Sequence, residues 1–195
     1  MVARIVPLVV LAACTPRLYT SGGTDTEWSW EAPANDWPTA APPEGTRGQG
    51  LSVGQTVPDL RLADQFGNEV SLWQFHGRVV LVDISTMWCA PCQELANSTE
   101  STQQRFGADE FVYTTVLQEN VESQPPTTDD LNVWADFFGI TAPVLADGEK
   151  ITGSAVQNGQ YPALLLIGPD LVVHERINPV DEATVDAAIE ELLGG

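Results

Sequence analysis

Two cysteines separated by two residues occupy positions 89 and 92, in the stretch TMWCAPCQEL. Such a pair serves as a redox dithiol, as one half of a zinc site, or as a structural bridge. A zinc site needs about four ligands, and the histidines available to complete one, His76 and His174, are not in zinc-finger spacing. A bridge between Cys89 and Cys92 closes a loop too small to restrict much of the unfolded chain. The sequence therefore favours the redox interpretation.

The segments on either side of the pair predict how it is positioned. The apolar, β-branched run RVVLVDIS (78–85) is typical of a buried strand, and PCQELANSTESTQQRF (91–106) can form a helix. A cysteine at the start of a helix lies in partial positive charge that stabilises its thiolate. We therefore expect Cys89 to attack disulfides, and Cys92, one turn later, to resolve the mixed disulfide and release the product. Pro91 costs no hydrogen bond in the first helical turn and stiffens the loop between the sulfurs.

The charge of the chain makes two classes of partner poor candidates. Its 27 acidic and 8 basic residues give a formal net charge of −19. A surface of this kind repels nucleic acid and anionic lipid head groups. The acidity is interpreted first as a source of solubility, with the steering of basic protein partners as the alternative.

The N-terminus reads as a signal segment. A short basic start, MVAR, precedes the apolar run IVPLVVLAAC, which is far shorter than the roughly 20 residues that span a bilayer. Its end, LAAC, resembles the lipobox of bacterial lipoproteins, in which the cysteine thiol is lipidated before cleavage. This resemblance implies a signal peptide at 1–13 and a lipid anchor on Cys14; an ordinary signal peptide that contains a cysteine is the alternative. Lipidation of Cys14 would leave Cys89 and Cys92 as an isolated pair outside the cytoplasm.

The next segment is predicted to be a flexible, lipid-anchored tether. Residues 14–48 show no apolar period and are rich in Pro, Gly, Thr and acidic residues. They also hold three of the six tryptophans, Trp28, Trp30 and Trp37. Contact with the globular domain, with a partner or with the membrane interface would each explain these side chains. The globular domain is expected to occupy residues 49–195.

The domain is predicted to be of the α/β class. Strands alternate with helices along the chain, which ends in a hairpin and a final helix. Thr128 is expected to cap the second helix. This pattern predicts a mixed central sheet with helices on both faces and an N-terminal β-hairpin extension. Besides the strand and helix around the cysteines, the expected elements are a hairpin at 59–72, strands at 110–118 and 142–147, helices at 129–139 and 181–193, and a hairpin at 162–177.

Three stretches carry a resemblance to a known family. VVLVDISTMWCAPC resembles the active-site strand and helix of the thioredoxin superfamily, with its Trp-Cys-x-Pro-Cys sequence. GQTVPDLRLADQFGNEVSLWQFHGRVVLVD is similar to the opening of the TlpA/ResA-like (redoxin) branch, whose members work in the cell envelope. GQYPALLLIGPD matches the second landmark of the superfamily, a cis-proline that faces the disulfide. The resemblance covers residues 51–193 and implies a thioredoxin-like fold; we expect no cofactor and no bound metal.

The resemblance also implies roles for individual residues. Cys89 would be the attacking thiol and Cys92 the resolving thiol. Trp88 would flank and shield the sulfurs, and Pro162 would lie in cis against them. Tyr161 would line the groove that receives a substrate strand. Plain packing is the alternative role for Trp88 and Pro162.

Asp83 lies six residues before Cys89, where cytoplasmic thioredoxins have a buried acid that shuttles the proton of the resolving thiol. The alternative is an acid at the end of a strand that faces solvent, but its place within an apolar run opposes this. Thioredoxin pairs its buried acid with a lysine. In this chain the available lysine is Lys150, which is far in sequence from the strand expected to hold that lysine. The chain therefore departs from the thioredoxin pattern at this point.

The function that follows is that of an extracytoplasmic, membrane-anchored thiol–disulfide oxidoreductase. Pro91 before the second cysteine resembles reducing members, so a disulfide reductase is favoured. The expected partners are disulfide-containing envelope proteins, a membrane electron donor, and the lipid bilayer through acylated Cys14, with no nucleic acid.

Two rival functions remain as alternatives. A peroxiredoxin-like thiol peroxidase is suggested by Thr86, three residues before Cys89, although Val82 stands where that family has a proline. A Sco-type copper-binding chaperone uses CxxxC with a distant histidine. Here the spacing is CxxC, and His174 lies within an expected strand.

Overall fold

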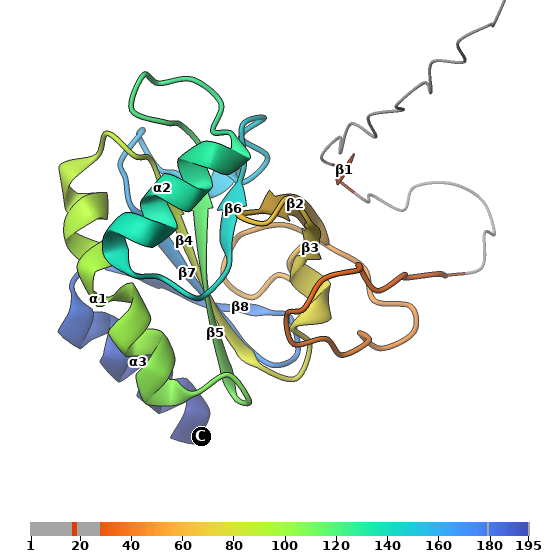
Figure 1. Ribbon diagram of the computed structural model, residues 1–195. Helices are drawn as coiled ribbons and strands as arrows, with labels where there is room; N and C mark the ends of the chain where they lie inside the picture. Colours follow the sequence, from red (N-terminus) through yellow and green to blue (C-terminus); the bar gives the residue numbers. More distant parts are fainter. Residues whose placement is uncertain (1–16, 19–27, 179, 195) are drawn as a thin grey trace, which may run out of the picture.

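The computed structural model describes residues 17–18, 28–178 and 180–194, which form a mixed sheet with helices packed against it (Figure 1). Among the described residues, no helix is both long and apolar enough to cross a bilayer. The strands are β1 (Arg17–Leu18), β2 (Leu60–Asp64), β3 (Glu69–Ser71), β4 (Val79–Ser85), β5 (Phe111–Leu117), β6 (Val144–Ala146), β7 (Ala163–Ile167) and β8 (Val173–Ile177). The helices are α1 (Ala90–Phe106), α2 (Thr128–Phe138) and α3 (Glu182–Gly194), with 3-10 helices η1 (Leu72–Gln74) and η2 (Gly153–Ala155).

The strand that precedes the cysteine pair, β4, lies in the interior of the sheet, between β5 and β7. The strand order is β1-β2-β6-β5-β4-β7-β8, with β3 paired to β2. β4 runs parallel to β5 and antiparallel to β7, and all seven of its residues are buried. An uninterrupted apolar run is what a strand covered on both faces requires. The predicted mixed sheet and N-terminal hairpin are therefore present.

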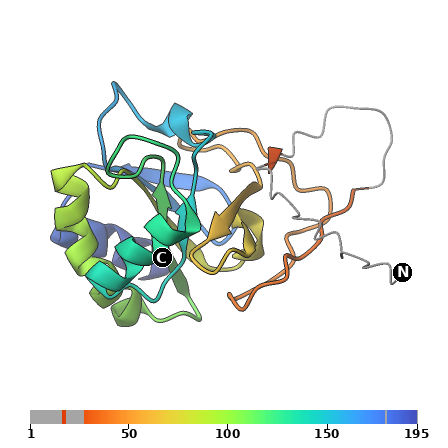
Figure 2. The ribbon, with the colours of Figure 1, turned by 45° about the horizontal axis from the view of Figure 1, so that its top comes forward.

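The α-helices gather on one face of this sheet. Leu95 of α1, Leu131 of α2 and Ile189 of α3 belong to one buried apolar cluster, together with Leu81 of β4. Figure 2 shows the three helices on the same side of the strands, away from the N-terminal segment. The sequence also predicted helices on the second face. This face is covered by the 3-10 helices and by residues 28–48, and Trp73 of η1 belongs to the buried apolar cluster there.

The start of α2 lies one residue earlier than predicted. Thr127, not Thr128, is the N-cap: its hydroxyl accepts the backbone N–H of Asp130, whose carboxylate accepts the N–H of Thr127. This reciprocal arrangement is a capping box. Thr127 is followed by an acid three positions later, whereas Thr128 is followed there by Leu131. The spacing of the acid therefore decides between the two threonines.

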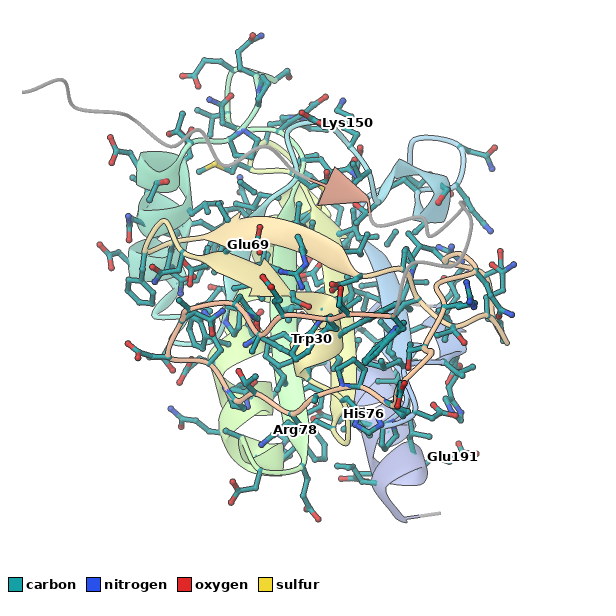
Figure 3. The ribbon with its side chains drawn as sticks, turned by 90° about the vertical axis from the view of Figure 1, so that its right-hand side faces the viewer. Trp30, Glu69, His76, Arg78, Lys150 and Glu191 are labelled. Carbon is teal, nitrogen blue, oxygen red and sulfur yellow. A yellow bond between two sulfur atoms is a disulfide. The ribbon has the colours of Figure 1, made fainter. Side chains whose placement is uncertain are left out.

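The prediction of a flexible tether does not hold for residues 28–48, which pack on the second face of the sheet. The Trp37 indole N–H donates to Asp64 at 2.7 Å, and the Trp30 indole N–H donates to the hydroxyl of Ser71 at 3.2 Å. Both rings also pack against the buried cluster of that face. In Figure 3, which looks onto this face, Trp30 lies near its centre. These contacts bury aromatic surface and satisfy the indole donors, which holds the segment in place.

The predicted signal peptide and Cys14 lie outside the described residues. Of the tryptophan partners considered from the sequence, the globular domain is the one that Trp30 and Trp37 contact. Trp28 instead donates to the carbonyl of Thr46, within the same N-terminal segment.

Candidate active site

Cys89 and Cys92 form a disulfide at the start of α1. Cys89 is the N-cap of the helix, and the backbone N–H of Cys92 points at its sulfur, 3.3 Å away. Pro91 lies in the first turn, where its missing N–H is not needed. Cys89 is 5% exposed, whereas Cys92 is fully buried. Both cysteines are therefore buried, with Cys89 the slightly more accessible of the two, and the pair lies at the strand-to-helix junction that the sequence predicted.

The loop that precedes β7 lies against this disulfide. The peptide bond between Tyr161 and Pro162 is cis, as predicted. The carbonyl oxygen of Tyr161 lies 3.5 Å from the sulfur of Cys89. Antiparallel pairing of β7 with β4 places Ala163 opposite Ile84, so the residues before Ala163 arrive at the end of β4 where α1 begins. The sheet register thus brings together two segments that are about seventy residues apart.

Two aromatic side chains stand beside the disulfide. Trp88, the residue before Cys89, is 46% exposed. Its ring meets that of Tyr161 edge to face, with centroids 6.0 Å apart. Edge-to-face contact is a favourable geometry for aromatic pairs. An exposed aromatic corner beside a sulfur can receive an apolar part of a client chain.

Asp83 is buried on the helix-covered face of β4. It is 1% exposed, which excludes the solvent-facing alternative. Its carboxylate accepts hydrogen bonds from the hydroxyl of Ser85 at 2.6 Å and from that of Tyr113 at 3.3 Å. Burial raises the pKa of Asp83 to about 6, against the lowering effect of these two hydrogen bonds. The carboxyl can therefore gain and lose a proton close to neutral pH.

Tyr113 and Ser85 replace the lysine that thioredoxin places beside its buried acid. Burial, and then the nearby charge of Asp83, raise the pKa of Tyr113 well above its ordinary value, so its hydroxyl remains a donor. Neither residue was identified from the sequence. Ser85 carried a usable signal, since residues two apart on a strand share a face. Tyr113 could be found only by knowing how β5 lies in register with β4.

Two further residues that were not identified from the sequence hold the side chains of Trp88 and Tyr161 in place. They directly follow β5: Gln118 accepts a hydrogen bond from the hydroxyl of Tyr161, and Glu119 accepts one from the indole of Trp88. Lys150 pairs with Glu119 and so serves a different acid from Asp83. No sequence spacing predicts these contacts, which join residues 31 and 43 positions apart.

His174 and Thr86 are the residues that the sequence linked to a copper-binding chaperone and to a thiol peroxidase. His174 lies on β8, 43% exposed, with its Nε2 3.7 Å from Asp170. Within the described part of the chain, no three His, Cys, Asp or Glu side chains are grouped as a metal site requires. Thr86 is buried, and its hydroxyl has no hydrogen-bond partner among the described residues. Its burial beside Cys89 does not by itself form a peroxide pocket.

Comparison with known proteins assigns the chain to a family. Residues 53–176 match the sequence model of the AhpC/TSA family. The chain belongs to this redoxin family. It is 29% identical over 102 residues to the thioredoxin-like protein YneN of Bacillus subtilis, a match that covers 52% of this chain and 58% of YneN. It is 30% identical over 122 residues to the thiol-disulfide oxidoreductase ResA of Geobacillus thermodenitrificans, covering 60% of this chain and 64% of ResA.

The match thus spans less than two thirds of the length of these redoxin relatives. Among solved structures, the chain is similar to the thioredoxin domain of a thiol-disulfide oxidoreductase from Bacteroides vulgatus, with a TM-score of 0.60 and 18% identity. That similarity covers 74% of this chain and 99% of the other. This redoxin therefore has the thioredoxin-like fold that the sequence predicted.

Proposed function

We propose that this redoxin is a thiol–disulfide oxidoreductase that acts on disulfides of other proteins through Cys89 and Cys92. The observation that carries the proposal is the arrangement of the disulfide: it caps a helix, and Cys89, the more accessible of the two cysteines, lies beside the cis-proline loop. Similarity to ResA, which is named for this activity, supports the proposal. Val82 stands where the peroxidase family has a proline, and this favours disulfide exchange over the peroxidase alternative.

The reaction balances as two exchanges between sulfurs. In the reduced protein, the thiolate of Cys89 attacks one sulfur of a client disulfide; the client bond breaks, and its leaving sulfur takes up a proton. Cys92 then loses its proton and attacks Cys89, which breaks the mixed disulfide and releases the second client thiol. The client gains two electrons and two protons, and the Cys89–Cys92 disulfide is formed. A dithiol donor must then reduce this disulfide, and we assign that role to a membrane electron donor.

Asp83 is proposed to handle the proton of Cys92. Alternation along β4 places Asp83 on the same face as Leu81, whose cluster contains Cys92. Its pKa of about 6 suits a group that accepts a proton near neutral pH. The start of α1 favours the thiolate of Cys89 by its partial positive charge, so the two thiols are activated by different means.

The direction of electron flow is tested by the reduction potential of the Cys89–Cys92 couple. We expect a value near that of thioredoxin, about −270 mV, because Pro91 resembles the proline of reducing members. Equilibration with glutathione redox buffers, followed by alkylation of free thiols, measures it. In parallel, the reduced protein should reduce insulin disulfides. A potential near −120 mV would instead identify an oxidant, and rapid consumption of hydrogen peroxide without insulin reduction would favour the peroxidase.

The location is proposed to be the cell envelope, with the protein held to the membrane by a lipid on Cys14. Support comes from the LAAC sequence at its signal segment and from similarity to ResA. The clients would then be disulfide-containing envelope proteins. We expect Cys14→Ser to leave an unlipidated protein, uncleaved or soluble, whose dithiol reacts as before because the proposed reaction uses Cys89 and Cys92. Labelled fatty acid that still entered the Cys14→Ser protein would exclude this anchor.

A further inference from the structure

The two residues after β5 each hold one of the aromatic side chains beside the disulfide. Glu119 accepts the indole N–H of Trp88 at 2.6 Å, and Gln118 accepts the hydroxyl of Tyr161 at 2.7 Å. The backbone of Glu119 also accepts the N–H of Met87 at 2.9 Å, which extends the pairing of β4 and β5 up to the residue before Trp88. Glu119 therefore fixes this turn by its backbone and its side chain together.

Both residues are tied in turn to the loop at 147–152. Lys150 forms an ion pair with Glu119. The Gln118 amide donates to Asp147 at 3.1 Å and to the hydroxyl of Thr152 at 2.7 Å, and Asp147 also accepts the backbone N–H of Thr152 at 2.9 Å. We refer to Gln118, Glu119, Asp147, Lys150 and Thr152 as the rim clamp. Lys150 lies in the upper part of the view in Figure 3.

Three members of the rim clamp are buried, and two are more accessible to solvent. Gln118, Asp147 and Thr152 are buried, and each has its polar atoms paired. The side chains of Glu119 and Lys150 are 16% and 46% exposed. The hydrogen bond from Lys150, and that from Trp88, hold the pKa of Glu119 below its ordinary value. Glu119 is therefore a carboxylate at neutral pH, and a charged acceptor strengthens its bond to the indole.

We propose that the rim clamp holds Trp88 and Tyr161 as fixed walls for the client chain, with Gln118 and Glu119 as positioning residues that set reactivity toward protein disulfides. The inference rests on the proposed function. Trp88 is 46% exposed and would otherwise have to be ordered when a client binds, at a cost in conformational entropy. Walls that are already ordered avoid this cost. A small disulfide reagent needs only the sulfur of Cys89 and is indifferent to the walls.

Glu119→Ala tests the inference with two disulfides of different size. With insulin, kcat/KM should fall about ten-fold, mainly through a higher KM, since binding of the client is what the walls assist. With 5,5′-dithiobis(2-nitrobenzoate), the rate should change less than about two-fold, because no wall is used. Glu119→Gln keeps an acceptor for the indole and should recover most of the insulin activity. Lys150→Met, a change at an exposed side chain, should show a smaller loss in the same direction.

Glu122→Ala is the matched control, since it removes the same charge from an exposed position in the neighbouring loop. It should leave both rates unchanged. Insulin kinetics of Glu119→Ala equal to those of the wild type would overturn the inference. A parallel loss with both disulfides would also overturn it, because Glu119 would then act on the dithiol itself.

A spectroscopic measurement separates failure of the rim clamp from failure of the proposed function. The indole N–H resonance of Trp88, assigned by its absence in Trp88→Phe, should exchange slowly with water in the wild type and in Glu122→Ala. It should exchange at least about ten-fold faster in Glu119→Ala, where the hydrogen bond is lost. Equal exchange in all three proteins would overturn the rim clamp. A wild type that reduces neither insulin nor the small reagent would overturn the proposed function, and this signal would still decide the role of Glu119.

Discussion

Cys89→Ser is expected to abolish reduction of a protein disulfide, whereas Cys92→Ser is expected to stop the reaction one step later with the client still attached. A serine hydroxyl is almost entirely protonated at neutral pH and cannot replace a thiolate, so the loss in Cys89→Ser should be about a thousand-fold or more. In Cys92→Ser the attack still occurs, but no thiol is present to release the client. Non-reducing gels of cells that express each variant would show the trapped complexes.

The exposure of the two sulfurs gives this asymmetry its physical basis. Cys89, which lies beside the carbonyl of Tyr161, is 5% exposed, whereas Cys92 is fully buried. Client complexes of Cys92→Ser should disappear on treatment with dithiothreitol, as expected for a mixed disulfide. The double variant with both serines should trap nothing and serves as the control. Equal trapping by Cys89→Ser and Cys92→Ser would show that the nucleophile is misassigned.

The parts of the site that could be predicted from the sequence are those that depend on local spacing. The apolar run before Cys89 predicts β4, and Pro91 is compatible with a helix that begins beside the cysteines. The position of Pro162 in cis followed from a resemblance and is present in the structure. Asp83 was predicted to be buried because it lies within an apolar strand, and it is. In each case, the residues that support the prediction lie within one short stretch of the sequence.

The parts that were missed depend on contacts between distant segments. Tyr113 lies 30 residues from Asp83 in the chain, and the two meet through the register of β4 with β5. Trp37 contacts Asp64 across 27 residues, although its own segment has the composition of a tether. A segment without an apolar period is predicted to form no regular helix or strand. It does not show whether isolated aromatic side chains find a surface to pack on, which depends on the fold of the remaining chain.

Asp83→Asn is expected to slow release of the mixed disulfide by ten-fold or more, since a general base contributes a factor of roughly 10² to 10⁴. The attack by Cys89 should keep its rate, because the start of α1 and not Asp83 stabilises that thiolate. Rapid mixing of the reduced protein with a disulfide substrate at pH 7 resolves the two steps. An unchanged release rate in Asp83→Asn would leave this residue with a structural role.

The same carboxyl should appear in the pH dependence of stability. The folded pKa of Asp83, about 6, lies above its ordinary value of 3.8. The folded state therefore binds the proton more tightly than the unfolded state, and the wild type loses stability as pH rises from about 4 through about 6. Asp83→Asn does not titrate, so its stability relative to the wild type should increase over this interval. A shift of about two pKa units corresponds to an increase on the order of 3 kcal/mol.

Urea unfolding of both proteins between pH 4 and pH 7 measures this difference, and a constant difference would contradict a raised pKa. Tyr113→Phe provides the matched control, since it keeps the ring but removes a hydrogen bond that lowers the pKa of Asp83. In that variant the pKa should rise further. The release step requires ionised Asp83, so the release rate should increase with pH through about 6 in the wild type and at higher pH in Tyr113→Phe. A carboxylate that accepts the proton of Cys92 links the stability profile and the release rate in this way.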